Sequence, residues 1–411
     1  MDRDELTGWL RLVITPQIGP TAARKVLAAF GSPQAVFHAP TRALQAVVGE
    51  AAGKALGTEP EGLAAHVQAT LDWLAASPAH AVVTLGDAGY PARLLEMADP
   101  PLLLFAQGRL EALRGPLLAI VGARHPTPQG VDNARAFAAH FSREGWTVVS
   151  GLAAGVDGAA HEGALDGPSP TIAIVGTGLD RVYPARHRAL AHRIVGHGLI
   201  LSEYLLGTPP LAPNFPKRNR LIAALGQGTL VVEAAVQSGS LITARLAAEM
   251  GREVLAIPGS IHNPLSRGCH ALIKQGAKLV ETAEDVLEEL RGGMRAPLLA
   301  AEPAGADEAP GQGGPAAGRR AAPADARPAP RVEADADEAG AADADVDADT
   351  DATGPHASLL QALGWDPVHL DALAARTGIG PALLQAQLLE LELLGEVARL
   401  PGQLFQRVGR A

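Results

Sequence analysis

The sequence predicts a doubly wound α/β protein, in which an extended Rossmann-like parallel sheet stands between a small helical domain and a C-terminal winged helix. Three observations predict this fold class. Short apolar runs alternate with helical patterns through the middle of the chain, glycines directly follow several of these runs, and helical periodicity dominates both flanks. Runs that are apolar at every position are typical of parallel strands covered by helices on both faces.

Residues 1–75 are expected to form a helical domain. Apolar side chains from Leu6 to Ile14 follow a helical period, residues 16–20 interrupt it with two prolines and a glycine, and a second helical pattern runs to Phe30. Helix, tight glycine hairpin and helix is the layout of helix-hairpin-helix or SAM-like modules, whose hairpin amides can hold a DNA phosphate. A small packing bundle explains the same pattern, and both interpretations stay open.

Residues 80–292 carry the alternating pattern that predicts the Rossmann-like core. The expected strands cover residues 117–121, 147–149, 171–175, 199–201, 230–232 and 254–257. Helical patterns over residues 131–141, 186–195 and 241–250 separate many of these strands. Strands joined by crossover helices form a parallel sheet with helices on both faces.

Residues 293–354 are expected to be a disordered acidic linker rich in Ala, Pro and Asp. Residues 295–354 hold thirteen acidic against five basic side chains, so most of the formal net charge of −10 lies in this one segment. The rest of the chain is close to neutral, and its overall acidity therefore does not exclude nucleic acid as a ligand. A plain spacer is the preferred interpretation of the linker, ahead of a mimic of DNA charge.

Residues 355–411 return to helical periodicity and then show a short hairpin pattern. Leucines at helical spacing predict three helices, and Gly395 followed by residues 397–405 predicts a two-stranded wing. Three helices and a hairpin make a winged helix. Its expected recognition helix, residues 379–391, contains no Lys or Arg, which disfavours reading of a major groove and favours protein contact.

The chain is expected to be cytoplasmic. Cys269 is its one cysteine, which excludes an internal disulfide framework and a Cys-based zinc site and fits a reducing compartment. The first ten residues include acidic side chains and lack the pattern of a signal peptide. No apolar run reaches the length needed to cross a bilayer, so no membrane partner is expected.

Glycines cluster at the expected carboxyl ends of four strands, where open parallel sheets bind their ligands. These strands continue into Gly122-Ala123-Arg124, Ser150-Gly151, Gly176-Thr177-Gly178 and Pro258-Gly259. Glycine lets backbone amides approach a phosphate closely, and a following helix N-terminus favours the anion. Each turn alone is common, but four at one edge predict a phosphate-binding edge.

No nucleotide cofactor is predicted. The sequence GARHPTPQG after the first of these strands lacks the spacing G-x-G-x-x-G, and the Gly-Lys-Ser/Thr of a P-loop does not occur in the chain. Binding of NAD or ATP therefore has no sequence signature.

The densest basic cluster is Asn214-Phe215-Pro216-Lys217-Arg218-Asn219-Arg220, directly before an apolar helical pattern. Cations beside an aromatic ring supply the phosphate charge and the base stacking that single-stranded nucleic acid requires. Cations at the positive end of a helix are unfavourable unless an anion lies nearby, which weighs against a merely solvated helix start. Ser238-Gly239-Ser240 opens a later helix and offers hydroxyls and amides to an anion.

Several side chains are conceivable catalytic groups, but each has a simpler interpretation. Glu233 at a strand end is interpreted as a carboxylate that orients its neighbours, and Asp157 and His161 as partners in structural hydrogen bonds. Cys269 and His270 are adjacent in the sequence, which is poor geometry for a nucleophile and its base. No catalytic residue and no metal ligand is therefore predicted.

Together these segments resemble the DNA-processing protein A family, known as DprA or Smf. The resemblance rests on VGARHPTPQG, SGLAAGVDGAAHEGAL, GTGLDRVYP, FPKRNRLIAALGQGTLVVEAAVQSGSLITARLAAEMGREVLAIPG and LIKQGA, which follow one another along nearly the whole chain outside the linker. One departure is His270, where many members carry asparagine, so a polar contact from this position is not carried over.

The resemblance implies a homodimer that binds single-stranded DNA and helps to load the RecA recombinase on it, in natural transformation and recombination. It implies a binding protein that is not an enzyme and has no cofactor. By matching motif, it places the DNA-binding site at Gly122, Arg124, Ser150, Gly151, Lys217, Arg218, Asn219, Arg220, Ser238, Gly239, Ser240, Pro258 and Gly259, with Phe215 as a stacking neighbour.

A nucleotide hydrolase is the alternative interpretation. Residues 226–233 faintly resemble the Gly-Gly-x-Gly-Thr-x-x-Glu loop of nucleoside-monophosphate phosphoribohydrolases, which share a Rossmann-like core, with Glu233 and Arg124 as candidate catalysts. The first glycine of that loop is missing here. A mononucleotide also needs neither the basic cluster at Lys217 nor a winged helix, so DNA binding is preferred.

Overall fold

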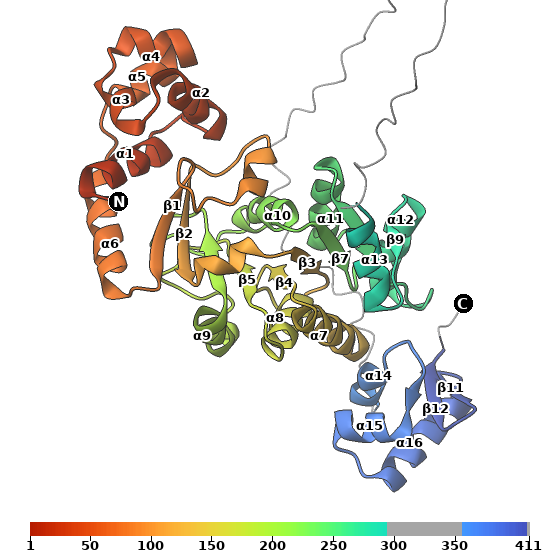
Figure 1. Cartoon of the computed structure of the whole chain (residues 1–411). Helices are drawn as coiled ribbons and strands as arrows, with labels where there is room; N and C mark the ends of the chain where they lie inside the picture. The colour runs from red at the N-terminus through yellow and green to blue at the C-terminus, as the bar shows by residue number, and fades with distance from the viewer. Residues whose placement is uncertain (294–355, 409–411) are drawn as a thin grey trace, which may run out of the picture.

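The computed structural model describes residues 1–293 and 356–408 (Figure 1). The linker expected over residues 293–354 lies outside the described residues except for its first position.

Six helices form the N-terminal part of the chain. They are α1 (Arg3–Ile14), α2 (Pro20–Phe30), α3 (Pro33–His38), α4 (Thr41–Val48), α5 (Glu50–Leu56) and α6 (Leu63–Ala76). Asp2 caps α1 by accepting a hydrogen bond from the Glu5 amide at 2.8 Å. The turn between α1 and α2 is closed by the Ile18 amide, which donates to the Thr15 carbonyl at 3.2 Å. Its layout fits a helix-hairpin-helix, whose contact with DNA stays a prediction.

The core is a nine-stranded sheet in the order β1-β2-β6-β5-β4-β3-β7-β8-β9. The strands are β1 (His80–Thr84), β2 (Leu103–Gly108), β3 (Leu117–Val121), β4 (Thr147–Ser150), β5 (Thr171–Ile174), β6 (Leu199–Ser202), β7 (Gly228–Val231), β8 (Glu253–Ala256) and β9 (Lys278–Leu279). The seven strands β6-β5-β4-β3-β7-β8-β9 pair in parallel with their neighbours in this order. β2 pairs antiparallel with both β1 and β6. The chain order reverses at β3, which lies between β4 and β7, and such a switch point is where open α/β sheets bind ligands.

Helices cover both faces of this sheet (Figure 1). Leu118 and Ile120 of β3 pack with α7 (Pro128–Arg143), α8 (Val156–Leu165) and α13 (Ala283–Gly293), and α9 (Arg188–His197) continues the same layer over β5 and β6. Ala119 and Val121 face the opposite layer of α10 (Asn214–Leu225), α11 (Gly239–Glu249) and α12 (Arg267–Lys274). Burial of alternate side chains on opposite faces confirms the predicted doubly wound fold class.

The six predicted strands are present, whereas β1, β2 and β9 were not predicted. β1 and β2 pair as neighbours although η1 (Ala92–Glu96) and its flanking loops separate them, so no short hairpin turn marks the pairing. β9 has only two residues, and both are exposed. β9 therefore lacks a buried apolar run, whereas the first four residues of β2 form one that the sequence analysis missed.

The last described segment has the elements of the predicted winged helix. These are α14 (Ala357–Leu363), β10 (Val368–His369), α15 (Leu370–Thr377), α16 (Pro381–Leu393), β11 (Val397–Leu400) and β12 (Leu404–Arg407), with strand order β10-β12-β11. An ion pair joins it to the core, because the Arg376 guanidinium lies 2.9 Å from the Asp132 carboxylate of α7. Across the described segments, no helix combines the length and apolar character that crossing a bilayer takes.

Candidate nucleic-acid interface

Two adjoining pockets lie at the carboxyl edge of the sheet, beside the switch point between β3 and β7. The first, which we call the Ser238 pocket, has a volume of about 100 Å³, and the second, the Tyr183 pocket, has about 140 Å³. Both are lined by Arg124, Ala153, Phe215 and Arg218, which therefore form their shared wall. The Ser238 pocket is completed by Val121, Gly122, Asp157, Pro216, Asn219, Ile222, Gln237, Ser238, Gly239, Ser240, Ile242 and Thr243. The Tyr183 pocket is completed by His125, Gly151, Ala154, Val175, Gly176, Thr177, Tyr183, Pro184 and Arg186.

Gly122 lets the loop after β3 pass closely beside α8. A β-carbon at this position would lie 2.7 Å from Val156 Cγ2 and 2.9 Å from the Glu233 carbonyl oxygen. The Ala123 amide donates to that same carbonyl at 2.7 Å. The backbone that carries Arg124 is thereby held at the pocket wall, where the sequence placed it.

Phe215 provides an aromatic surface between the cations. The guanidinium carbons of Arg124 and Arg218 each lie 5.9 Å from the centre of its ring, within the range of a cation–π contact. The Tyr183 ring lies against Phe215 with centroids 5.4 Å apart and planes at 41°. Tyr183 is 47% exposed, so two aromatic rings and two cations meet where a base and its phosphate can be held together.

Arg218 is a buried member of this wall. Its guanidinium donates to the carbonyls of Gly151 and Ile174, and its Nη2 lies 4.0 Å from Asp157 Oδ2. Asp157 in turn accepts hydrogen bonds from the amides of Gly151 at 3.1 Å and Ala153 at 3.3 Å. Burial raises the pKa of Asp157, and the Arg218 guanidinium opposes that rise. Asp157 therefore orients the loop after β4, in agreement with its structural interpretation.

Ser150 and Gly151 lie at the end of β4 and hold the residues of the pocket wall in place. The Ser150 hydroxyl donates to the Ile120 carbonyl at 2.7 Å and is fully buried. The Gly151 amide donates a hydrogen bond to the Asp157 carboxylate, and the Gly151 carbonyl accepts one from the Arg218 guanidinium. These two residues thus position Arg218, and only Gly151 lines a pocket.

The other polar residues of the basic cluster diverge around α10. Asn219 lines the Ser238 pocket and donates to the Gly239 carbonyl at 3.3 Å. Lys217 is exposed, with its Nζ 5.7 Å from the Tyr204 ring centre, and it lines neither pocket. Arg220 turns away to Glu203 and to Asp99, whose carbonyl lies 2.8 Å from Arg220 Nη1. The structure therefore does not bring Arg220 to the pocket edge.

The start of α11 forms the far side of the Ser238 pocket. Ser238 caps the helix by accepting a hydrogen bond from the Ser240 amide at 3.3 Å, and the two hydroxyl oxygens lie 2.6 Å apart. The first amides of a helix lack partners within it and favour an anion. Ser238, Gly239 and Ser240 therefore lie where the sequence placed them, opposite Arg124 and Arg218.

Pro258 and Gly259 follow the end of β8 at the same sheet edge but line neither pocket. The Gly259 carbonyl lies 3.1 Å from His270 Nε2. A polar contact from position 270 is thus present, although the sequence comparison did not carry one over.

Glu233 holds α7 and does not face either pocket. Its carboxylate accepts hydrogen bonds from the Thr127 amide at 2.8 Å and the Thr127 hydroxyl at 2.6 Å, and Thr127 caps α7. Burial raises the pKa of Glu233, and the hydrogen bonds from Thr127 counteract this. The geometry agrees with an orienting carboxylate.

The remaining candidate groups are enclosed. His161 lies 2.8 Å from the Thr171 hydroxyl through Nδ1, and burial lowers its pKa to about 3. Cys269 is fully buried, and burial raises its pKa to about 12, which suppresses the thiolate. Within residues 1–293 and 356–408, no three His, Cys, Asp or Glu side chains are grouped to hold a metal ion.

Sequence reasoning missed part of the pocket wall. Tyr183, Arg186 and Gln237 line the pockets although none was singled out. Tyr183 lies in the segment GTGLDRVYP, which was noted only for its resemblance. An aromatic residue shortly after a glycine-rich strand end was the available signal.

Family models match two parts of the chain, the core and the C-terminal segment. The family model described as DNA recombination-mediator protein A matches residues 81–291, and that of the DprA winged helix domain matches residues 341–403. Protein Smf of Escherichia coli is 39% identical over 346 residues, covering 84% of this chain and 82% of that protein. DNA processing protein DprA of Streptococcus pneumoniae is 48% identical over 200 residues, covering 49% and 71%. The X-ray structure of DprA from Streptococcus pneumoniae superposes with a TM-score of 0.57 at 36% identity, covering 70% of this chain and 98% of that chain. The chain belongs to the DNA recombination-mediator protein A family, the DprA or Smf proteins of DNA processing.

Proposed function

We propose that this chain binds single-stranded DNA at the two pockets and acts as a binding protein without a catalytic step. The observation that carries the proposal is the shared wall, where the Arg124 guanidinium and the Tyr183 ring both lie against the ring of Phe215, and buried Arg218 holds the wall in place. Cations supply the phosphate contact and exposed rings supply stacking on bases, which together suit an unpaired strand. In a duplex the bases are paired and stacked on one another, so they cannot stack on the rings of Phe215 and Tyr183.

The side chains divide into those that contact DNA and those that hold them. The proposed contacts are Arg124, Asn219, Phe215 and the Ser238 turn, which line the pockets, together with Lys217, which is exposed on α10 next to them. Ser150, Gly151 and Arg218 position the wall, since their hydrogen bonds are made within the protein. Pro258, Gly259 and Arg220 lie outside the pockets and are not part of this proposed contact surface.

The function is tested by fluorescence anisotropy with a labelled dT oligomer of about twenty nucleotides. Arg124→Ala and Lys217→Ala should each weaken binding about tenfold or more, because a charge-assisted contact contributes roughly 1.5–3 kcal/mol. Arg143→Ala, at an exposed position at the end of α7, is the matched control and should bind as the unaltered protein does. Binding should fall steeply with added salt, and duplex of equal length should compete poorly.

Failure takes two recognisable forms. If the unaltered protein does not bind, the function is wrong, and assays for hydrolysis of nucleoside monophosphates around Glu233 come next. If it binds and both variants bind equally well, the pockets are not the site.

We propose further that the protein acts in the cytoplasm as a homodimer and helps to load RecA on the bound strand, in recombination and natural transformation. The family's description as a recombination mediator supports this role. Two linked pockets of modest affinity would bind a long strand much more tightly than one. Sedimentation should show a dimer, and RecA filament formation on protein-covered single strands should accelerate with the unaltered chain but not with Arg124→Ala.

A further inference from the structure

One surface of the core carries basic side chains that continue from the Tyr183 pocket, which Arg186 lines, along α9. Residues 181–202 contain four arginines and three histidines and no Asp or Glu. Arg186 lies in η3 (Ala185–His187) and lines the Tyr183 pocket, and Arg188, His192, Arg193 and His197 follow along α9.

The basic side chains of α9 point to solvent. Leu190, Ala191 and Ile194 bury one side of α9 against the sheet, whereas Arg188, His192, Arg193 and His197 are exposed. In the part of the chain that the structure describes, Arg186, Arg188 and Arg193 form no ion pair. Arg181 differs, because the Asp180 carboxylate lies 3.0 Å from its guanidinium.

The arrangement is electrostatically unfavourable for the protein alone. Arg188 is the first residue of α9 and Arg186 precedes it, so both stand at the positive end of the helix dipole. No acidic side chain within residues 181–202 offsets them. A bound polyanion would remove this penalty.

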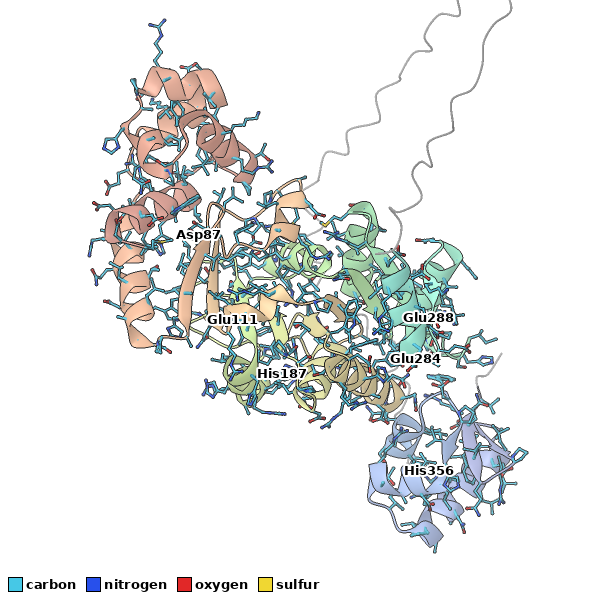
Figure 2. The ribbon with its side chains drawn as sticks, viewed as in Figure 1. Asp87, Glu111, His187, Glu284, Glu288 and His356 are labelled. Carbon is cyan, nitrogen blue, oxygen red and sulfur yellow. The ribbon has the colours of Figure 1, made fainter. Side chains whose placement is uncertain are left out.

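The helix also leads away from the pockets. Its first turn follows η3 at the Tyr183 pocket, and its last residue, His197, precedes β6 at the opposite edge of the sheet. Ten helical residues span about 15 Å. Figure 2 labels His187 at the start of this helix, and Figure 1 shows α9 at the end of its layer away from the winged helix.

We propose that this α9 face, formed by Arg186, Arg188, His192, Arg193 and His197, is a second contact surface for single-stranded DNA. It takes the strand where it leaves the Tyr183 pocket and holds its phosphates along the helix. The inference rests on the function proposed above and extends it from a pocket to a track. Because α9 carries no Phe, Tyr or Trp, its contacts are to the backbone and independent of base sequence.

The test compares an α9 double variant with a matched control of equal charge change. Arg188→Ala/Arg193→Ala removes two arginines that line neither pocket, and Arg143→Ala/Arg291→Ala removes two exposed arginines from the ends of α7 and α13. Binding is measured with dT oligomers of about four and about twenty nucleotides, at several salt concentrations. Circular dichroism melting of each variant checks that the fold is kept.

The α9 variant should bind the long oligomer about tenfold more weakly than the control, and the salt slope should fall by about 1.4 because two phosphate contacts are lost. The loss should be much smaller for the short oligomer, which the pockets alone can hold. Equal binding of the long oligomer by both double variants would overturn the track while leaving the pocket function, judged by Arg124→Ala, intact. An equal loss with both oligomers, relative to the control, would also overturn it, since the α9 arginines would then act on the strand inside the pockets and not on the strand beyond them. Absence of any binding by the unaltered protein would overturn both proposals.

Discussion

Replacing Arg218 with methionine should destabilise the core, although this arginine belongs to the basic cluster that the sequence assigns to DNA. The Arg218 side chain is 5% exposed, and that of its partner Asp157 is 9% exposed. Removal of one partner from a buried ion pair costs about 3–5 kcal/mol, because the other charge stays behind uncompensated. The carbonyls of Gly151 and Ile174 lose a charged donor as well. We therefore expect the free energy of unfolding to fall by about 3–5 kcal/mol.

The loss should depend on pH in a defined direction. Burial raises the pKa of Asp157, and Arg218 opposes the rise, so the variant should raise the folded-state pKa of Asp157 further. A group whose pKa is higher in the folded than in the unfolded state stabilises the fold at low pH and loses that contribution as the pH rises through the folded value. The difference from the unaltered protein should therefore be largest near about pH 8 and shrink toward about pH 5.

Urea unfolding of the full-length chain at both pH values measures the effect. Lys217→Met is the matched control, since Lys217 is adjacent in sequence but exposed, and it should change the free energy of unfolding by less than about 0.5 kcal/mol. Asp157→Asn in the Arg218→Met background should restore stability, because the amide oxygen still accepts from the Gly151 and Ala153 amides. If Arg218→Met matches Lys217→Met in stability, or if its loss is neither pH-dependent nor relieved by Asp157→Asn, then Arg218 is free to serve DNA and our assignment is wrong.

Three further substitutions separate supporting from contacting residues. Arg220→Ala should lower the free energy of unfolding by about 3 kcal/mol, because it leaves the buried Glu203 carboxylate unpaired, while dT affinity of the folded protein in anisotropy stays the same. Glu233→Ala should lower stability by about 1–3 kcal/mol, because the amide and hydroxyl of Thr127 lose their acceptor, and a release assay with nucleoside monophosphates should detect no hydrolysis by the unaltered protein. Gly151→Ala should reduce both the melting temperature and dT affinity, because its β-carbon would collide with the Arg218 guanidinium; unchanged behaviour would show that Arg218 is not held there.

The sheet was predictable where local pattern and burial coincide. The β3 segment, Leu117–Val121, is buried at every position and was predicted with its observed ends. β2 is buried over its first four residues, but its antiparallel pairing with β6 is a long-range contact that no local signal encodes. Local composition therefore predicts that a strand is present. The order of the strands depends on which side of the preceding strand each connection places the next one, and the local sequence does not encode this.

The site was predictable as a region but not residue by residue. The basic cluster reads as one uninterrupted motif, yet an α-helix turns by about 100° at each residue. Arg218 and Arg220 therefore point to different sides of α10, one toward Gly151 and the other toward Asp99 and Glu203. Asp99 lies in the loop before β2 and Glu203 directly follows β6. Both are distant from Arg220 in sequence, so their pairing with it could not be predicted from the motif. His270 was not expected to make a polar contact, but it makes one. Its partner is the backbone carbonyl of Gly259, a group that every residue type provides and that no sequence motif marks.

This division of cations has a consequence for how DNA binding depends on salt. Counterions are released only by cations that meet phosphates, and each phosphate of a single strand contributes about 0.7 to the slope. Arg218 and Arg220 are buried and paired within the protein, so they add nothing to it. Contacts through Arg124 and Lys217 alone give a slope of about 1.4, whereas the three arginines at the α9 face would raise it to about 3.5. The slope measured with the long oligomer therefore counts the exposed cations in use, and a value near the lower figure would confine the strand to the pockets.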